Sequence, residues 1–256
     1  MISGLLAKEV ATPQNVWASD VRPERVQHLA KQFGVHGVTD NREALATCDV
    51  AVLSVKPQNL REALGGLRGH VSKGQLVLSI VAGARIATIS RGLVHEQIVR
   101  AIPNTPGQVG EGITVWTASE HADRAHREAA RAILRCLGTD LYVPDESYID
   151  MATAVSSSGP AYVFLFIEAL IDAAVHIGFP REMAQQLVIQ TVRGSAAFAQ
   201  LSGKHPAELK NMVTSPGGTT VEGLLELEAA GLRAAVARAV IAAHTKAKVL
   251  GSAAEE

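Results

Sequence analysis

Short apolar runs alternate with helical patterns over the first 145 residues, and after about Asp145 the apolar runs stop. Strands are expected at Asn15–Ser19, Asp49–Val55, Gln75–Ile80 and Gln97–Ile102. Helices are expected after the first three of them, at Pro23–Phe33, at Gln58–Leu67 and near Ile86–Arg91. Strands without polar alternation are buried on both faces, as in a parallel sheet that helices cover. The alternation therefore predicts a doubly wound α/β domain over residues 1–145.

The second part of the chain, residues 146–256, has helical patterns throughout. Helices are expected at Asp145–Val155, Pro160–Ile177, Pro180–Leu201, Pro206–Val213, Pro216–Ala229 and Gly231–Leu250. Proline stands at or near the start of four of these, where its missing N–H costs nothing. The sequence thus predicts an all-helical domain after the α/β domain.

Charge and cysteine content exclude several classes of partner and site. The formal net charge is −1, from 24 Lys and Arg against 25 Asp and Glu, and no basic block stands out. Nucleic acid is therefore not an expected partner, because it requires a clustered positive surface. Cys48 and Cys136 cannot form a disulfide framework, and neither has a second ligand at metal spacing. No metal site is expected, and a reducing, cytoplasmic compartment fits this composition.

The longest apolar stretch, Ala161–Ile177, contains Glu168, Asp172 and His176. These residues are four apart and lie on one helix face. We therefore expect a buried or interface helix, and no membrane span. We expect no secretory signal at the start of the sequence, because Met1–Leu6 is short and charged residues follow it.

Three short motifs follow expected strands and indicate a ligand site. In a doubly wound sheet, ligands bind at the carboxyl ends of the strands. The motifs are Val55-Lys56-Pro57, Val81-Ala82-Gly83 and Pro103-Asn104-Thr105-Pro106. Each alone is a weak signal, since Gly and Pro end many strands. Together they outline a crevice of small and polar residues that suits a flat ring and a ribose.

Ser19, Asp20 and Arg22 follow the first expected strand and bear on the choice of dinucleotide. An acid at this place favours the ribose hydroxyls of NAD, while a nearby Arg can pair with the 2′-phosphate of NADP. Both residue types are present, so the sequence leaves NADPH and NADH open. The alternative is that Asp20 and Arg22 are solvated loop charges.

A Gly-x-Gly-x-x-Gly turn after a first strand is not found in this sequence. A helix-like stretch, Ile2–Lys8, leads directly into what would be the second strand of the pattern. We expect a strand and turn, roughly 15–25 residues, to be lacking, which would leave a gap at the centre of the sheet. The alternative is that the fold differs from this pattern.

The loop of residues Ser215–Thr220 narrows the function most. Ser215 and Pro216 suit the first positions of a helix, and Gly217 and Gly218 allow a close approach of backbone to a ligand. Thr219 and Thr220 add two hydroxyl groups beside open backbone N–H donors. Such a helix start is an anion site, which predicts that the loop holds a small carboxylate. The alternative is an ordinary helix start. Ser156-Ser157-Ser158-Gly159-Pro160 suits a second helix start, either functional or a simple capping run.

These motifs together resemble the Δ1-pyrroline-5-carboxylate reductase family over nearly the whole chain. The resemblance rests on Val-Lys-Pro-Gln (55–58), Ile-Val-Ala-Gly (80–83), Arg-x-Ile-Pro-Asn-Thr-Pro (100–106), Ser-x-Ser-Gly-Pro-Ala-Tyr (156–162) and Val-Thr-Ser-Pro-Gly-Gly-Thr-Thr (213–220). It implies an NADPH- or NADH-dependent enzyme that makes L-proline from 1-pyrroline-5-carboxylate. It also implies a Rossmann-like α/β domain, here N-terminally incomplete, followed by an all-α dimerisation domain. Homodimers, often in larger assemblies, are the implied partners.

The resemblance also implies roles for single residues. Thr220 matches the threonine proposed to bind the ring nitrogen and help deliver a proton, and the whole Ser215–Thr220 loop matches the carboxylate site. The cofactor positions are Ser19, Asp20 and Arg22 beside the adenosine ribose, and Val55, Lys56, Pro57, Ala82, Gly83 and Asn104 beside the nicotinamide and its ribose. Two further departures are Asn211, where many members carry an acid, and Ser157, which replaces a common Gly.

Two other functions stay open from the sequence. One is a related dehydrogenase acting on a hydroxy acid or on prephenate, with Lys210 as the nearest candidate base, although the Gly-Gly-Thr-Thr loop is not part of that pattern. The other is a catalytically impaired or inactive dimeric homologue that lacks the loop for the cofactor pyrophosphate.

Overall fold

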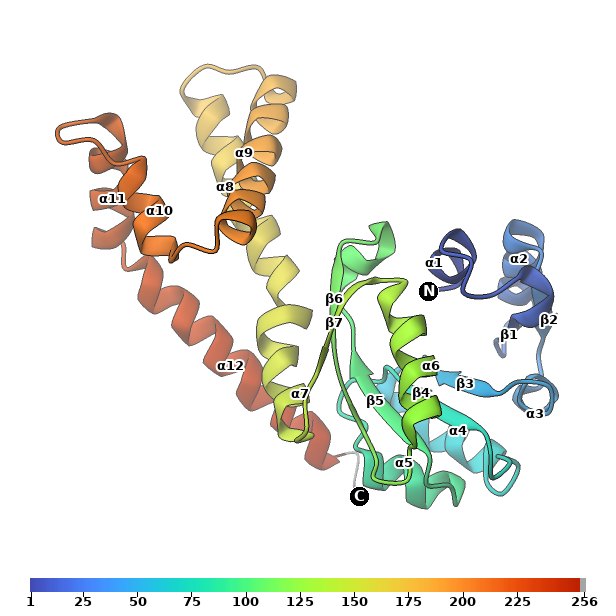
Figure 1. The fold of residues 1–256 in the computed structure, drawn as a ribbon. Helices are drawn as coiled ribbons and strands as arrows, with labels where there is room; N and C mark the ends of the chain where they lie inside the picture. The colour runs from blue at the N-terminus through green and yellow to red at the C-terminus, as the bar shows by residue number, and fades with distance from the viewer. Residues whose placement is uncertain (254–256) are drawn as a thin grey trace. The chain divides into compact units, whose positions relative to one another are not determined.

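A computed structural model describes residues 1–253 and divides into two compact units. The first unit contains Met1–Ser158 and the last part of the chain from Ala242, and the second unit contains Gly159–Ile241. The chain therefore leaves the first unit after Ser158 and returns to it before Ala242. Figure 1 shows the mixed α/β part and the helical part along the chain.

A five-stranded sheet forms the centre of the first unit. Its order is β3 (Val50–Leu53), β4 (Leu76–Ser79), β5 (Ile98–Ile102), β6 (Gly112–Ala118) and β7 (Gly138–Tyr142). Strands β3, β4 and β5 are parallel, and every residue of β4 and β5 is buried, as their mostly apolar sequences predict. Strand β6 runs antiparallel to β5, and neither β6 nor β7 was among the strands expected from the sequence.

A second, smaller sheet holds β1 (Trp17–Ser19) and β2 (His36–Val38) in parallel, joined by α2 (Pro23–Phe33). The rings of Trp17 and His36 stack across the two strands, with centroids 4.5 Å apart. No strand of residues 1–253 joins this sheet to the larger one. Strands β1 and β3 each have one unpaired edge within that range.

Helices cover both faces of the larger sheet, as a doubly wound fold requires. One hydrophobic cluster packs α4 (Leu60–Leu67) and α5 (Ile86–Leu93) on one side, through residues such as Leu64, Ile89 and Val77. The other cluster contains Leu78, Trp116 and Leu134, and Leu134 belongs to α6 (Arg124–Arg135). The remaining short helices of this unit are α1 (Ile2–Ala7), α3 (Asn41–Leu45) and α7 (Ser147–Ala152).

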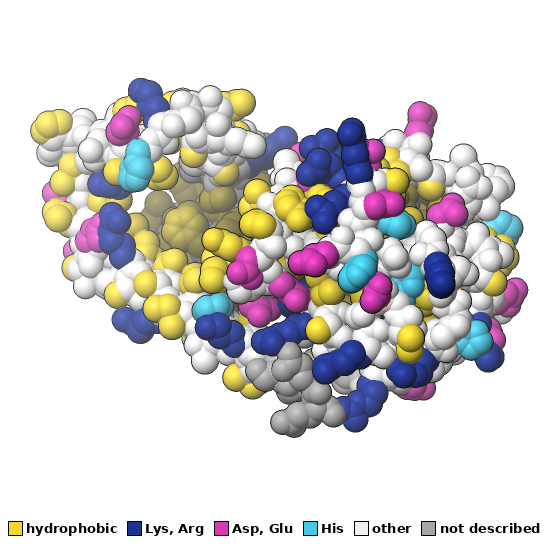
Figure 2. Space-filling view, turned by 60° about the horizontal axis from the view of Figure 1, so that its bottom comes forward, with side chains coloured by type: hydrophobic (Ala, Val, Ile, Leu, Met, Phe, Trp, Pro, Cys, Tyr) yellow, Lys and Arg dark blue, Asp and Glu magenta, His cyan; other side chains and the backbone are white. Residues whose placement is uncertain are grey.

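The second unit is helical, as predicted. It contains α8 (Gly159–His176), α9 (Arg181–Ser202), α10 (Pro206–Met212), α11 (Thr219–Ala229) and the first part of α12 (Leu232–Ala253). Helix α8 has no buried residue, and Phe164 and Leu165 on it are 60% and 66% exposed. Figure 2 shows many hydrophobic side chains gathered in one hollow of the surface.

Residues Ser156–Ser158 do not begin a helix with open N–H groups, so that expectation is wrong. A π-helical turn, Thr153–Ser157, follows α7 directly and leads into α8. The Ser158 N–H donates to the Thr153 carbonyl at 2.9 Å, and Ser156 Oγ donates to the Ala152 carbonyl at 2.9 Å. The serines thus satisfy backbone within a continuous helical run, and π-turns of this kind are frequent near functional sites.

Candidate functional site

The three strand-end motifs of the first unit lie at one edge of its sheet. Parallel strands β3, β4 and β5 are neighbours, with Leu53 opposite Ser79 in register, so their carboxyl ends point the same way. The segments Val55–Pro57, Ala82–Gly83 and Asn104 follow these three ends. This confirms the expected placement of the motifs, and their contact with a cofactor stays a prediction.

The turn after β4 contains the half-buried Ala82 and the buried Gly83. Gly83 has φ +75°, in the left-handed region, and Ala82 packs against a small cluster that includes Ile102 and Ile149. A side chain at position 83 would lie 3.2 Å from the Leu250 carbonyl of α12. Both the left-handed conformation and the tight contact therefore favour glycine here.

The segments on either side of this turn are fixed differently. The Asn104 Oδ1 accepts a hydrogen bond from the Ile113 N–H at 3.0 Å, so this side-chain oxygen holds the loop to β6. Lys56 is exposed and precedes a 3₁₀ turn, and its carbonyl accepts from the Asn59 N–H at 2.9 Å. Val55 packs against the hydrophobic cluster beneath the sheet. The Lys56 side chain is one group at this edge that is open to a ligand.

A buried arginine links this edge to α7. Arg100 of β5 is 1% exposed and donates to Glu146 Oε1 and to Asp150 Oδ1, at 2.8 Å each. The same Glu146 oxygen accepts from the Ile86 N–H at 2.9 Å, at the start of α5. Glu146 and Asp150 were not among the site residues predicted from the sequence. The signal that could have found them is an arginine inside an apolar strand, because a buried charge requires acidic partners.

The ends of β1 and β2 form a polar edge. Ser19 Oγ donates to Asn41 Oδ1 at 2.7 Å and so connects the end of β1 to the start of α3. Asp20 accepts from the Arg22 backbone N–H at 3.0 Å and pairs with its guanidinium at 3.2 Å. The hydrogen bonds from Arg22 hold the pKa of Asp20 below its ordinary value. Asn41 is a further polar residue that the sequence analysis did not single out.

The Ser215–Thr220 loop lies in the second unit, between α10 and α11. Helix α11 begins at Thr219 with Gly218 as its N-cap, so Ser215 and Pro216 precede the helix and do not occupy its first positions as predicted. Gly217 has φ +67°, and the Gly218 N–H donates to the Ser215 carbonyl at 3.0 Å. No side chain caps α11, because its N-cap residue is a glycine.

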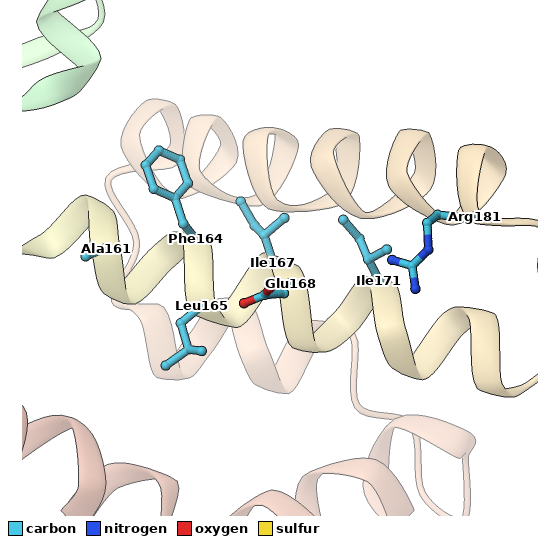
Figure 3. A pocket seen from close by; sticks show the side chains of 7 residues that line it. All are labelled: Ala161, Phe164, Leu165, Ile167, Glu168, Ile171 and Arg181. Carbon is cyan, nitrogen blue, oxygen red and sulfur yellow. The ribbon is translucent and has the colours of Figure 1, made fainter.

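The second unit also has an open groove of about 590 Å³ along α8. Its lining residues are Ala161, Phe164, Leu165, Ile167, Glu168, Ile171 and Arg181. Figure 3 shows Phe164, Ile167 and Ile171 on the same side of α8 and Arg181 at the start of α9. None of the predicted site residues lines this groove, and its walls are mainly apolar. Within residues 1–253, no group of three His, Cys, Asp or Glu residues could hold a metal ion.

Two family models match the chain. Residues 146–250 match pyrroline-5-carboxylate reductase dimerisation, and residues 1–83 match NADP oxidoreductase, coenzyme F420-dependent. The pyrroline-5-carboxylate reductase of Synechocystis sp. is 40% identical over 251 residues, which are 98% of this chain and 93% of that protein. That of Escherichia coli is 38% identical over 251 residues, again 98% and 93%.

Solved structures agree in fold. A pyrroline-5-carboxylate reductase from Coxiella burnetii has a TM-score of 0.86 and 35% identity, covering 97% of this chain and 93% of that one. The Plasmodium falciparum pyrroline carboxylate reductase with NADP bound has a TM-score of 0.88 and 32% identity, covering 97% and 92%. A prephenate dehydrogenase from A. aeolicus reaches a TM-score of 0.52 at 14% identity, with 91% and 93% covered, and shares the fold alone.

Proposed function

The chain belongs to the pyrroline-5-carboxylate reductase family, and we propose that it works through the sheet edge of its first unit and the Ser215–Thr220 loop of its second. It reduces 1-pyrroline-5-carboxylate to L-proline with NADPH or NADH, the last step of proline biosynthesis. The observation that carries the proposal is the joint presence of both parts of the site. Three strand ends meet at one sheet edge, and a glycine-capped helix start carries two threonines.

The start of α11 suits the substrate carboxylate. The first N–H groups of a helix have no partner within the helix, and the helix dipole favours an anion there. Gly218 as N-cap provides no side-chain cap for the Thr219 and Thr220 N–H groups, while the Val221 N–H donates to the Gly218 carbonyl at 3.0 Å, and the left-handed Gly217 shapes the turn before them. We assign Ser215, Pro216, Gly217, Gly218, Thr219 and Thr220 to substrate binding.

We assign to Thr220 the hydrogen bond with the imine nitrogen of the substrate. It is half-buried in the first turn of α11 and carries a hydroxyl that can donate or accept. The ring nitrogen must hold a proton while the neighbouring carbon gains a hydride, which the nicotinamide supplies when bound. The chain's contribution is to fix the carboxylate and the nitrogen so that this carbon faces the hydride.

The sheet edge fits a nicotinamide and its ribose. Ala82 and Gly83 form a turn without bulky side chains, and Lys56 is an exposed cation beside it. We assign Val55, Lys56, Pro57, Ala82, Gly83 and Asn104 to this half of the cofactor. We assign Ser19, Asp20 and Arg22 to the adenosine ribose, where the Asp20–Arg22 pair offers both an acceptor and a cation.

The chain forms a homodimer through its helical part. The exposed apolar residues of α8, including Phe164 and Leu165, and the groove beside them need a cover of this kind. The helical run Ser147–His176 is also long and apolar enough to cross a membrane, at a mean hydropathy of 1.5. We propose that the partner protomer covers this run instead, because acids within it, such as Glu168 and Asp172, would be costly in lipid. A cytoplasmic location, an association of dimers into larger assemblies and a domain division near residue 145 are parts of the same proposal.

The decisive test is an assay of NADPH and NADH oxidation that depends on 1-pyrroline-5-carboxylate, followed at the nicotinamide absorbance. We expect turnover that requires the substrate and yields proline. A dimer that binds neither cofactor and shows no turnover would overturn the proposal in favour of an inactive homologue. Turnover of prephenate or a hydroxy acid would favour a related dehydrogenase.

A further inference from the structure

Helix α5 takes its N-terminal cap from a distant part of the chain. Its own N-cap residue, Arg85, makes no side-chain cap, and the Ile86 N–H donates instead to Glu146 Oε1 at 2.9 Å. Sixty residues separate the two partners in sequence. Because α5 follows the Val81–Arg85 turn directly, Glu146 fixes the place where this turn ends.

Glu146 is itself held in place by the buried Arg100. The guanidinium donates to Glu146 and Asp150 at 2.8 Å each, and the side chain of Arg100 is 1% exposed. Charge-assisted hydrogen bonds of this length are strong, and they orient both carboxylates. The arrangement ties β5, the start of α5 and α7 to one another through three side chains.

The same turn is held from a second side by the end of α12. A side chain on Gly83 would lie 3.2 Å from the Leu250 carbonyl, so the two backbones pack without a gap. Glu146, the N-cap residue of α7, therefore contacts the start of α5, and the end of α12 contacts the turn before it. Removing Glu146 would release one of these two restraints.

We infer that Glu146 is a positioning residue that holds the Val81–Arg85 turn in the conformation that binds the nicotinamide. The inference rests on the proposed function, which assigns Ala82 and Gly83 to the cofactor. Glu146 acts through the α5 backbone, and Arg100 acts through Glu146. Loss of the cap leaves the fold in place and lets the turn move, which weakens cofactor binding.

Asp150 offers a matched control. It pairs with the same arginine at the same distance, and within residues 1–253 the structure records no hydrogen bond from it to the turn. Glu146→Ala and Asp150→Ala each leave Arg100 with one acid, so both should lower the melting temperature. Only Glu146→Ala removes the cap of α5.

Hydrogen exchange on the cofactor-free dimer tests the cap directly. We expect the amides of Ile86–Ile89 to exchange on the order of 10- to 100-fold faster in Glu146→Ala than in Asp150→Ala, as the loss of one hydrogen bond to a charged acceptor predicts. Glu146→Gln keeps an acceptor oxygen and should restore part of the protection. Equal exchange in Glu146→Ala and Asp150→Ala would overturn the inference, whatever the enzyme does. Should Glu146→Ala fail to fold, the same comparison is made between Glu146→Gln and Asp150→Asn.

Titration with NADPH tests whether the Glu146 cap affects cofactor binding. We expect Glu146→Ala to raise the Kd and the KM of NADPH about tenfold, with the KM of the pyrroline substrate unchanged, and Asp150→Ala to change neither. An equal rise in both variants would reduce Glu146 to a merely structural role. If the unaltered protein binds no NADPH, the proposed function fails, and the exchange experiment still decides the role of Glu146.

Discussion

Ser215 and Gly218 are packed so closely that a Cβ on Gly218 would lie 2.5 Å from Ser215 Oγ. The Gly218 N–H also donates to the Ser215 carbonyl at 3.0 Å, which closes a tight turn just before α11. Gly218→Ala should therefore displace Ser215 or the helix start and raise the KM of the pyrroline substrate at least tenfold, with the Kd of NADPH unchanged. Steady-state kinetics and a cofactor titration measure the two effects separately.

Gly223 supplies the control for this change. It lies within α11, and a Cβ there would meet nothing within 4 Å. Gly223→Ala should keep the KM of the substrate and raise stability by up to about 1 kcal/mol, because alanine favours the helix. Equal KM values in Gly218→Ala and the unaltered protein would show that the loop tolerates the shift and would count against its role in binding.

The hydroxyl of Thr220 is the second point to test. Thr220→Val keeps the shape of the side chain and removes the hydrogen bond, so turnover should fall by about 10- to 10³-fold. Thr220→Ser keeps the hydroxyl and should retain most of the activity. An unchanged rate in a folded Thr220→Val dimer would remove this residue from the mechanism.

We expect Gly83→Ala to destabilise the protein by more than the cost of the left-handed backbone conformation alone. Gly83 and Gly110 have φ values of +75° and +78°, but a Cβ meets the Leu250 carbonyl only at position 83. Alanine at either position costs about 1–2 kcal/mol for the left-handed conformation. Gly83→Ala should lower the melting temperature further than Gly110→Ala, because α12 must also move. Thermal unfolding at one fixed protein concentration measures the difference, and equal shifts would show that the α12 contact is loose.

The helices and strands that were predicted correctly are those whose type and ends are marked by residues within or next to the element itself. Helix α2 has the bounds that its sequence predicts, because Pro23 stands at its start and Gly34 ends it in the left-handed conformation. Strands β3, β4 and β5 were predicted from short, mostly apolar runs. In contrast, β2 has only three residues, and β6 is antiparallel to β5, a pairing that depends on the partner strand.

Some features of the site could likewise be predicted from the sequence, and others could not. The strand-end motifs could be placed at one edge because the order of parallel strands follows from the chain. The bonds from Ile86 to Glu146 and from Ser19 to Asn41 could not be predicted, because they join residues that only the tertiary fold brings together. The continuous helix through Ser156–Ser158 was hidden by Gly159 and Pro160, which resemble a helix start.

The environment of Asp140 allows a prediction of how folding stability changes at low pH. Its buried carboxylate accepts from Trp116 Nε1 at 2.9 Å and from Arg135 Nε at 2.6 Å. Burial alone would raise the pKa of Asp140, but the hydrogen bonds from Trp116 and Arg135 outweigh it and lower the pKa below its ordinary value. A lowered pKa contributes stability that is complete above the unfolded value of about 3.9 and is lost as the pH falls through the folded pKa. Asp140→Asn should therefore be less stable at pH 7, and the difference from the unaltered protein should shrink as the pH falls below about 4. Urea unfolding followed by tryptophan fluorescence at several pH values measures this, and a difference that stays constant down to about pH 3 would show that the carboxylate charge contributes nothing.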